Sequence, residues 1–254
     1  MTRLHGGPPY KTVFVHGGPG AIGSLKACAC EASRLSNTGV VEALQSKYSI
    51  AGLIEELHAQ VAQNCQEGAA LVGHSWGAWL SVLFAKEYPE LCKTIVLIGC
   101  PPLTDAYVGE ISSRRMQNLS EKECEAFRCL TVGAATGADM EQIPNILEKA
   151  DNYCLESSRA KEGGTDSEMY NRVWGEAAKL RTSGELLAAF RSIRSKLYLI
   201  QGDRDPHPAK GVTEPLTENG VPCEAYILEK CGHSPFMEKY AKEEFYRILL
   251  RIIL

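Results

Sequence analysis

Short apolar runs alternate along the chain with stretches of helical spacing. The clearest runs cover residues 12–15, 69–72, 94–98, 197–200 and 225–228, and residues 39–44 form a sixth, less regular one. Between residues 50 and 61 the apolar positions recur with a helical period, behind Ser49, a residue type that caps helices. Alternating strands and helices are typical of a parallel sheet covered by helices. The pattern predicts an α/β fold with about six strands, most of them parallel.

The pattern changes between residues 101 and 194. This segment is charged and helix-forming, contains no strand-like run and is interrupted at Gly163-Gly164. It follows the run that ends at Ile98, and α/β proteins bind ligands where their strands end. We therefore expect a core formed by residues 1–100 and 195–254 and a helical lid inserted over residues 101–194. An insertion without a role in the site is the alternative.

Composition and charge exclude several classes of protein. In 254 residues, 27 basic and 31 acidic side chains give a net charge of −4, so no binding surface for nucleic acid is expected. No apolar run reaches the roughly 18 residues of a membrane span, and the first residues lack a signal peptide's apolar stretch. In the apolar last ten residues, Arg247 and Arg251 share one helix face, which predicts a packing helix. We expect a cytoplasmic protein that does not bind membranes.

The ten cysteines predict neither a disulfide framework nor a zinc site. A chain of this length buries enough core to fold without disulfides. Cys28 and Cys30 have no matching second pair, and Cys124 and Cys129 are too far apart for a zinc knuckle. We expect free thiols, and neither a metal nor a cofactor.

The first chemical motif is Gly73-His74-Ser75-Trp76-Gly77, which lies between the apolar run 69–72 and a helical pattern. The G-x-S-x-G motif requires this context, because its glycines let strand and helix approach while the serine hydroxyl stays exposed at the end of the strand. Ser75 is therefore the candidate nucleophile. A serine in a turn of small residues is the alternative.

A serine hydroxyl needs a base, and in this architecture the order along the chain is nucleophile, acid, histidine. Of the six histidines, only His207 and His233 follow the motif. His207 lies between two prolines beside the candidate acid, whereas His233 lies in a loop beyond the last apolar run. We predict that His233 is the base.

The acid that orients this base should follow the preceding run. There, Gly202-Asp203-Arg204-Asp205-Pro206 offers two carboxylates. Asp205 is favoured because it lies further past the run and precedes a proline, which makes its backbone extended. Asp203 and Asp105 are the alternative acids. Asp203 is better suited to binding the amides of its own loop, a common role of aspartate in turns.

Acyl transfer also needs amide donors that stabilise the developing oxyanion. The loop His16-Gly17-Gly18-Pro19-Gly20 follows the first apolar run, and its glycines let a substrate approach the backbone. We predict that the amides of Gly18 and of Trp76, the residue after the nucleophile, form the oxyanion hole.

The motifs occur in the order strand, H-G-G-P-G loop, G-x-S-x-G elbow, G-x-x-D and G-H. In this order the sequence resembles the α/β-hydrolase superfamily, and within it the proline iminopeptidase-like group, over nearly the whole chain. The most specific segments are residues 16–20, 75–77 and 231–238. The resemblance implies that Ser75, Asp205 and His233 form a catalytic triad. It also implies that the amides of Gly18 and Trp76 form the oxyanion hole.

Two features depart from the family. Only about ten residues precede the first run, so the antiparallel hairpin that usually opens this fold is expected to be missing. Residues 39–45 stand where many relatives carry an arginine-glycine-rich segment. Relatives that release amino-terminal proline bind the free amino group with lid carboxylates. By this resemblance Trp174 and Glu176 are candidate substrate-binding residues, with packing and surface roles as the alternatives.

Three functions fit these residues. The first is a serine hydrolase that cleaves a small ester or amide through an acyl-enzyme intermediate. The second is a proline iminopeptidase that acts on short peptides. The third is a non-catalytic protein that holds a small ligand in the same pocket, against which the complete triad argues. Dehalogenases and epoxide hydrolases are excluded, because their chemistry needs a carboxylate at the position of Ser75.

Overall fold

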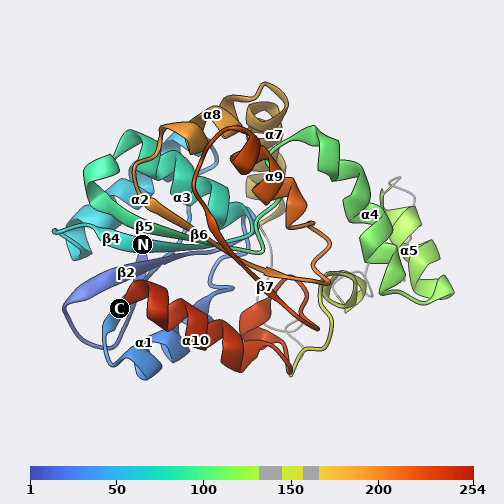
Figure 1. The fold of residues 1–254 in the computed structure, drawn as a ribbon, viewed down its shortest axis with the longest axis horizontal. Coiled ribbons are helices and arrows are strands. Elements are labelled where there is room, and N and C mark those ends of the chain that lie inside the picture. The colour runs from blue at the N-terminus through green and yellow to red at the C-terminus, as the bar shows by residue number, and fades with distance from the viewer. Residues whose placement is uncertain (132–144, 157–165) are drawn as a thin grey trace.

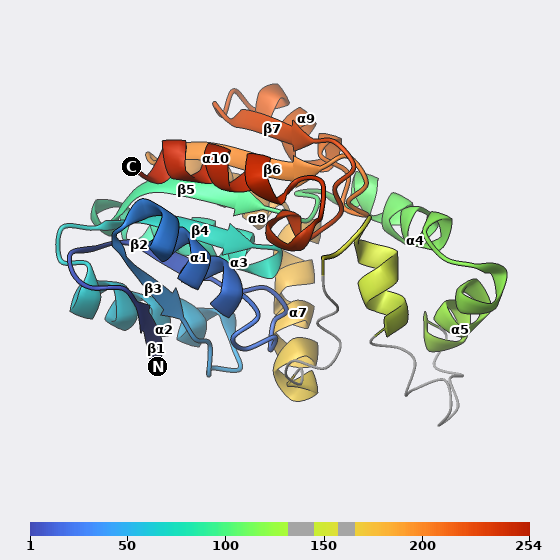
Figure 2. The ribbon, with the colours of Figure 1, turned by 90° about the horizontal axis from the view of Figure 1, so that it is seen from below.

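The computed structural model describes residues 1–131, 145–156 and 166–254. The described part of the chain forms one seven-stranded sheet in the order β1-β3-β2-β4-β5-β6-β7 (Figures 1 and 2). The strands are β1 (Thr2–His5), β2 (Tyr10–Val15), β3 (Gly39–Ala43), β4 (Ala69–His74), β5 (Cys92–Ile98), β6 (Lys196–Gly202) and β7 (Glu224–Leu228). β1 is antiparallel to β3, and the other neighbouring strands are parallel. The predicted fold class is confirmed, and each apolar run corresponds to one strand, with the run over residues 39–44 ending one residue beyond β3.

The first strand, β1, is not predicted by the apolar pattern. It pairs with β3 at the edge of the sheet, and its sequence Thr-Arg-Leu-His has one apolar residue. Polar contacts hold it in place. Arg3 donates from Nη1 to Oε2 of Glu42 at 2.7 Å, and His5 Nε2 lies 3.2 Å from the same oxygen of this fully buried carboxylate. One antiparallel strand therefore opens the chain, but it pairs with β3 and not with β2, so β1 and β2 do not form a hairpin.

Helices cover both faces of the sheet (Figures 1 and 2). One face carries an apolar cluster with α2 (Ile50–Asn64), α3 (Trp76–Glu87), α8 (Glu185–Ser192) and α9 (Lys210–Glu218). The other face carries α1 (Lys26–Ser36) and α10 (Lys242–Ile253). In the described part of the chain, no helix is long and apolar enough to cross a membrane.

Two predictions about individual helices are confirmed. Ser49 caps α2, and its side chain accepts a hydrogen bond from the amide of Gly52 at 3.2 Å. In the last helix, α10, Phe245 and Leu249 are fully buried, whereas Arg247 and Arg251 are exposed. The terminal apolar segment is thus a packing helix.

Between β5 and β6 the described residues form helices and connecting loops. The helices are α4 (Val108–Gln117), α5 (Glu121–Thr131), a helical stretch over residues 145–151, α7 (Ser167–Thr182) and α8. In Figure 2, α4 and α5 extend beyond the end of the sheet. By contrast, Val173 of α7 and Phe190 of α8 are fully buried in the cluster around α3. The segment therefore has a part that leaves the sheet and a part that packs onto it.

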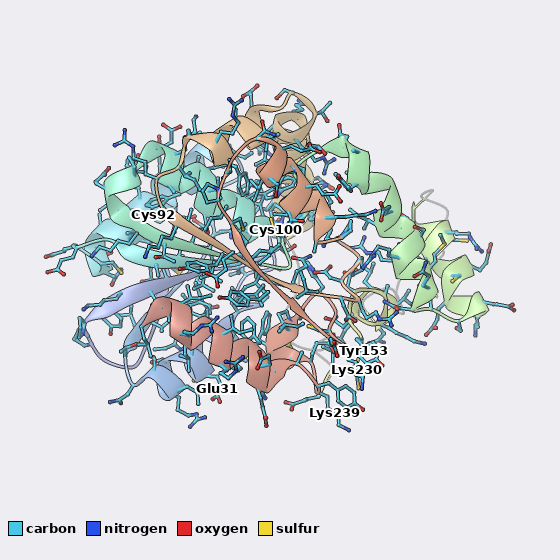
Figure 3. All side chains as sticks on the ribbon, viewed as in Figure 1. Glu31, Cys92, Cys100, Tyr153, Lys230 and Lys239 are labelled. Atoms are coloured by element: carbon cyan, nitrogen blue, oxygen red, sulfur yellow. The ribbon has the colours of Figure 1, made fainter. Side chains whose placement is uncertain are left out.

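All ten cysteines are free, as expected, and half of them are buried. Cys92 begins β5, and Cys100 follows its other end (Figure 3). Burial raises the pKa of Cys65 and of Cys92 to about 11. These thiols are therefore uncharged at neutral pH and pack as small apolar side chains.

Candidate active site

Ser75 lies at the turn between β4 and α3. Its φ of 53° is in the left-handed region, where a residue with a side chain is strained by about 1–3 kcal/mol. A Cβ at Gly73 would lie 2.3 Å from the carbonyl oxygen of Gly77, and one at Gly77 would lie 2.1 Å from that of Val15. Only glycine therefore fits either position. The Ser75 amide donates to the Ile98 carbonyl of β5 at 2.8 Å, which fixes the turn and leaves the side chain half-buried.

The loop over residues 16–20 lies against this turn. A Cβ at Gly17 would lie 3.1 Å from Cβ of Ser75, and Gly18 lines the same cavity as Ser75. Trp76 is the first residue of α3. Its amide has no acceptor within the helix and lies at the positive end of the helix dipole. The structure thus brings both residues predicted for the oxyanion hole next to Ser75.

Gln45 connects this loop to the turn, and the sequence does not single it out. Its side chain donates from Nε2 to the His16 carbonyl at 2.8 Å and accepts at Oε1 from Nε1 of Trp76 at 3.0 Å. Its backbone amide donates to His16 Nε2 at 3.2 Å. Because Nε2 accepts, His16 carries its proton on Nδ1 and donates to the Gly17 carbonyl at 2.8 Å. Burial lowers the pKa of His16, which favours this neutral form.

Asp205 and His233 meet beyond the carboxyl ends of β6 and β7. Nδ1 of His233 lies 3.0 Å from Oδ2 and 3.2 Å from Oδ1 of Asp205, whose side chain is fully buried. Burial by itself raises the pKa of Asp205, but the charge of His233 and hydrogen bonds from His207 and His233 outweigh it and hold the pKa well below its usual range. The ionised carboxylate in turn raises the pKa of His233 against the opposing effect of burial. With Nδ1 facing Asp205, Nε2 is the nitrogen that remains to act as a base.

The two alternative acids lie elsewhere. Oδ1 of Asp203 accepts a hydrogen bond from the Cys231 amide at 3.1 Å, a loop role of the kind expected for it. Asp105 binds Arg181 at 2.6 Å and Thr182 at 2.8 Å, on the surface of the segment between β5 and β6.

Three further residues hold Asp205. Gln201 donates from Nε2 to Oδ2 at 2.9 Å, and the backbone amide of His207 donates to Oδ1 at 2.9 Å. Arg114 donates from Nε to the Asp205 carbonyl at 3.0 Å. The only signal of Arg114 in the sequence is that it belongs to the single adjacent basic pair, and the second member of that pair, Arg115, also lies at the site.

Ser75 and His233 line one cavity of about 460 Å³. Apolar and aromatic side chains from α4 and α7 form part of its wall: Val108, Ile111, Tyr170 and Trp174. An ion pair forms another part, with Nε of Arg115 at 2.6 Å from Oδ1 of Asp151 and the second guanidinium nitrogen at 3.2 Å from Oδ2. The cavity therefore offers an apolar surface together with a neutralised ion pair.

Of the two lid residues expected to bind substrate, one lies at the cavity. Trp174 lines it and stacks between Trp79, with ring centroids 5.6 Å apart, and Tyr170, at 6.2 Å. Glu176 is not among the described residues that line the cavity. Its Oε2 instead accepts a hydrogen bond from the Ile50 amide at the start of α2, at 2.8 Å.

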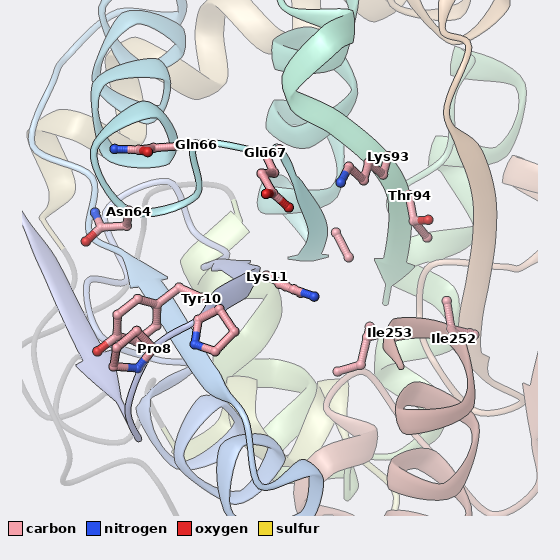
Figure 4. A pocket seen from close by; sticks show the side chains of 13 residues that line it. Pro8, Tyr10, Lys11, Asn64, Gln66, Glu67, Lys93, Thr94, Ile252 and Ile253 are labelled. Atoms are coloured by element: carbon pink, nitrogen blue, oxygen red, sulfur yellow. The ribbon is translucent and has the colours of Figure 1, made fainter.

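A second cavity, of about 380 Å³, lies at the opposite end of the strands, beside the amino ends of β2, β4 and β5 (Figure 4). Lys11, Glu67 and Lys93 are among the polar side chains around it. Open α/β sheets bind their ligands at the carboxyl ends of the strands. None of the candidate site residues lines this second cavity, so the site is placed at the first.

Comparison with known proteins identifies the same fold. The family model described as the alpha/beta hydrolase fold matches residues 26–240. Among solved structures, VinJ is similar with a TM-score of 0.74 at 16% identity, over 100% of this chain and 95% of that chain. The proline iminopeptidase of Mycobacterium smegmatis is similar with a TM-score of 0.67 at 16% identity, over 99% and 93% of the two chains. A carboxylesterase structure from the thaumarchaeon Nitrososphaera gargenis is similar with a TM-score of 0.68 at 17% identity, over 99% of this chain and 92% of that chain.

No curated protein matches the sequence. At these identities the similar structures establish the fold, while the family model covers most of the chain. The chain belongs to the alpha/beta hydrolase fold family.

Proposed function

We propose that the protein is a serine hydrolase that cleaves a small ester or amide through an acyl-enzyme intermediate. The observation that carries the proposal is the convergence of three residues distant in sequence. Ser75 and His233 line one cavity, and Nδ1 of His233 lies 3.0 Å from Oδ2 of the buried Asp205. The strained turn at Ser75 supports the same role, because strain of this kind is retained where a nucleophile needs to be exposed.

The residues would act in the following way. Nε2 of His233 takes the proton of Ser75 as its oxygen attacks the substrate carbonyl carbon, and the ionised Asp205 stabilises the imidazolium that forms. The negative charge that develops on the carbonyl oxygen is stabilised by the amides of Gly18 and Trp76. His233 then gives the proton to the leaving alcohol or amine. A water molecule, activated by the same imidazole, hydrolyses the acyl-enzyme.

We propose further that residues 101–194 form the lid that selects the substrate, over a core of residues 1–100 and 195–254. Its helices α4 and α7 supply the apolar and aromatic wall of the cavity. The last helix of the segment, α8, is buried against α3 and would anchor the lid to the core. The apolar wall favours a substrate with an uncharged acyl group.

The alternative of a proline iminopeptidase requires a carboxylate for the free amino group of the substrate. Among the described residues that line the cavity, Asp151 carries the one carboxylate, and Arg115 neutralises it. Glu176 is engaged at the start of α2. The geometry therefore favours esters or neutral amides over peptides with a free amino-terminal proline.

A fluorophosphonate probe tests the proposal directly. The parent protein should be labelled at Ser75, as located by peptide mass spectrometry, and Ser75→Ala should lose both labelling and hydrolysis of nitrophenyl acyl esters. Ser112→Ala is the matched control, because Ser112 lines the same cavity and has no role in the proposed mechanism. A folded parent protein that is not labelled would instead be a ligand-binding protein. Cleavage of proline aryl amides without cleavage of acyl esters would assign the iminopeptidase.

A further inference from the structure

Two imidazoles contact Asp205, and the proposed mechanism uses only one of them. Nδ1 of His207 lies 3.3 Å from Oδ1 of Asp205 and 3.3 Å from Nδ1 of His233. Nδ1 of His233 lies 3.2 Å from the same Oδ1. The three atoms thus form a nearly equilateral triangle, and all three residues are buried.

The size of this triangle matches one face of a tetrahedral zinc site. Zinc binds nitrogen and carboxylate oxygen at about 2.0–2.2 Å, and ligands at the tetrahedral angle are then about 3.3–3.6 Å apart. Ligands at right angles, as in octahedral or square-planar sites, would be only about 2.8–3.1 Å apart at similar bond lengths. The observed separations of 3.2, 3.3 and 3.3 Å therefore fit a tetrahedral cation better. Two imidazoles also favour zinc over magnesium or calcium, which prefer oxygen ligands.

We propose that Asp205, His207 and His233 bind Zn²⁺ reversibly, with a water molecule from the cavity as the fourth ligand, and that this binding switches hydrolysis off. The cation acts here as an inhibitor and not as a cofactor of the reaction. Its binding rests on the geometry alone, whereas its inhibitory effect rests on the proposed function.

The surroundings of the three ligands suit a cation. His207 and His233 both line the cavity, which gives an ion access to them. A Cβ at Gly99 would lie 2.8 Å from Nδ1 of His233, so the glycine keeps space beside this nitrogen. Gln201 holds Oδ2 of Asp205. Oδ1 accepts a hydrogen bond from the His207 amide, and its second lone pair, which His233 Nδ1 approaches at 3.2 Å, would serve a metal once the Nδ1 proton has moved to Nε2.

Coordination would remove the base without filling the substrate cavity. In the metal-free triad His233 carries its proton on Nδ1 and accepts the Ser75 proton at Nε2. With zinc on Nδ1, the neutral imidazole keeps its single proton on Nε2, which then has no lone pair to accept another. His207 likewise holds its proton on Nε2 while Nδ1 binds the ion. Asp205 stays ionised, so no net proton is released when both imidazoles are neutral beforehand.

Binding is tested first in a protein that cannot turn over substrate. Ser75→Ala, which keeps all three ligands, is titrated with CoCl₂, whose tetrahedral complexes absorb visible light strongly, and then with ZnCl₂ to displace the cobalt. We expect one tetrahedral cobalt per chain. The double variant Ser75→Ala/His207→Asn has a side-chain amide at residue 207 in place of the third ligand. Its cation affinity should be at least about tenfold weaker.

His58→Asn is the matched control, because His58 stacks on Tyr88 away from the cavity, and it should not change the affinity. Equal affinity with and without His207→Asn would overturn the site. So would a cobalt-thiolate absorption band that disappears in Cys30→Ser, because the cation would then be bound at an exposed thiol.

Inhibition is tested in the protein with Ser75 intact. Free zinc should lower the rate of ester hydrolysis, and EDTA should restore it. The zinc concentration that halves each protein's own rate should rise at least about tenfold in His207→Asn and stay the same in His58→Asn. An active parent that is insensitive to zinc would overturn the inhibition. A parent without hydrolase activity would contradict the proposed function, and the cobalt titration would still decide whether the site binds metal.

Discussion

At the residue scale, Asp203 and Asp205 show how two nearby carboxylates acquire different roles. Asp205 is fully buried and is contacted by two imidazoles, whereas Asp203 is exposed and accepts a hydrogen bond from a loop amide. A carboxylate is ionised in a protein interior only where charged or hydrogen-bonding partners offset its lost hydration. His207 and His233 supply these partners for Asp205. Their contacts make it the acid that would orient the base.

Replacing each of these carboxylates by its amide tests the assignment. Asp205→Asn should leave the fold intact but favour the wrong tautomer of His233, and kcat for an activated ester should fall by roughly 10⁴, the cost known from serine proteases. Asp203→Asn changes an exposed residue and should alter kcat by less than about threefold. Steady-state kinetics measure both effects, with circular dichroism as the check on folding. The reverse ranking of the two variants would move the acid to Asp203.

The motif residues are predictable because their roles depend on neighbours in the sequence. The elbow around Ser75 needs Gly73 and Gly77 two residues away on either side, and this spacing is visible in the chain. Gln45 is different, because its partners His16 and Trp76 lie 29 and 31 residues away. Gln45 reaches both partners only because β2, β3 and β4 lie side by side in the folded sheet. Contacts of this kind have no local signal in a single sequence.

At the element scale, apolar runs locate six of the seven strands of the described sheet but not the edge strand β1. The run over residues 69–72 becomes β4, in which every residue is buried, because a central strand contacts helices on both faces. β1 instead is positioned by Arg3 and His5 on the buried Glu42. A strand that is positioned by charged side chains has no apolar periodicity, so the hydrophobic pattern does not predict it.

This account of β1 makes a prediction about stability. Arg3→Ala removes a partner from a fully buried carboxylate and should lower the free energy of unfolding by about 1–3 kcal/mol. Arg34→Ala removes an exposed ion pair with Glu31 and should change it by less than about 0.5 kcal/mol. Urea denaturation of both variants measures the difference. Equal effects would show that β1 is held by its backbone pairing alone.

Helix α7, part of the proposed lid, carries a second prediction at this scale. Trp174 lines the cavity and stacks on Trp79 and Tyr170, so Trp174→Ala should both enlarge the cavity and loosen α7. We expect KM to rise more for esters of bulky aromatic acids than for a small activated ester, with a loss of stability of about 1–2 kcal/mol. Trp174→Phe, which keeps a stacked ring, should restore much of the parent protein's preference between the two kinds of ester. An equal loss on all substrates would mean that Trp174 only packs.

At the scale of the whole molecule, the reactive groups are concentrated at one end of the sheet. The carboxyl ends of β4, β6 and β7 lead to Ser75, Asp205 and His233, and the proposed lid follows the end of β5. The cysteines follow no such arrangement. They occur on both faces of the sheet, and the buried ones pack in its two apolar clusters. This distribution identifies the buried thiols as packing groups whose reactivity reports on opening of the fold.

The reactivity of the thiols is therefore the last prediction. Cys30 is exposed, whereas burial raises the pKa of Cys65 and Cys92 to about 11, so at pH 8 only about 0.1% of each buried thiol would be thiolate. Iodoacetamide should alkylate Cys30 first in the native protein and the two buried thiols at least about 100-fold more slowly, because they are both protonated and inaccessible. Their rates should rise about tenfold between pH 8 and pH 9, since both values lie below the pKa. Peptide mass spectrometry over time measures the order, with the urea-unfolded protein and Cys30→Ser as controls. Rapid alkylation of Cys92 in the native protein would show that the start of β5 opens far more often than its burial implies.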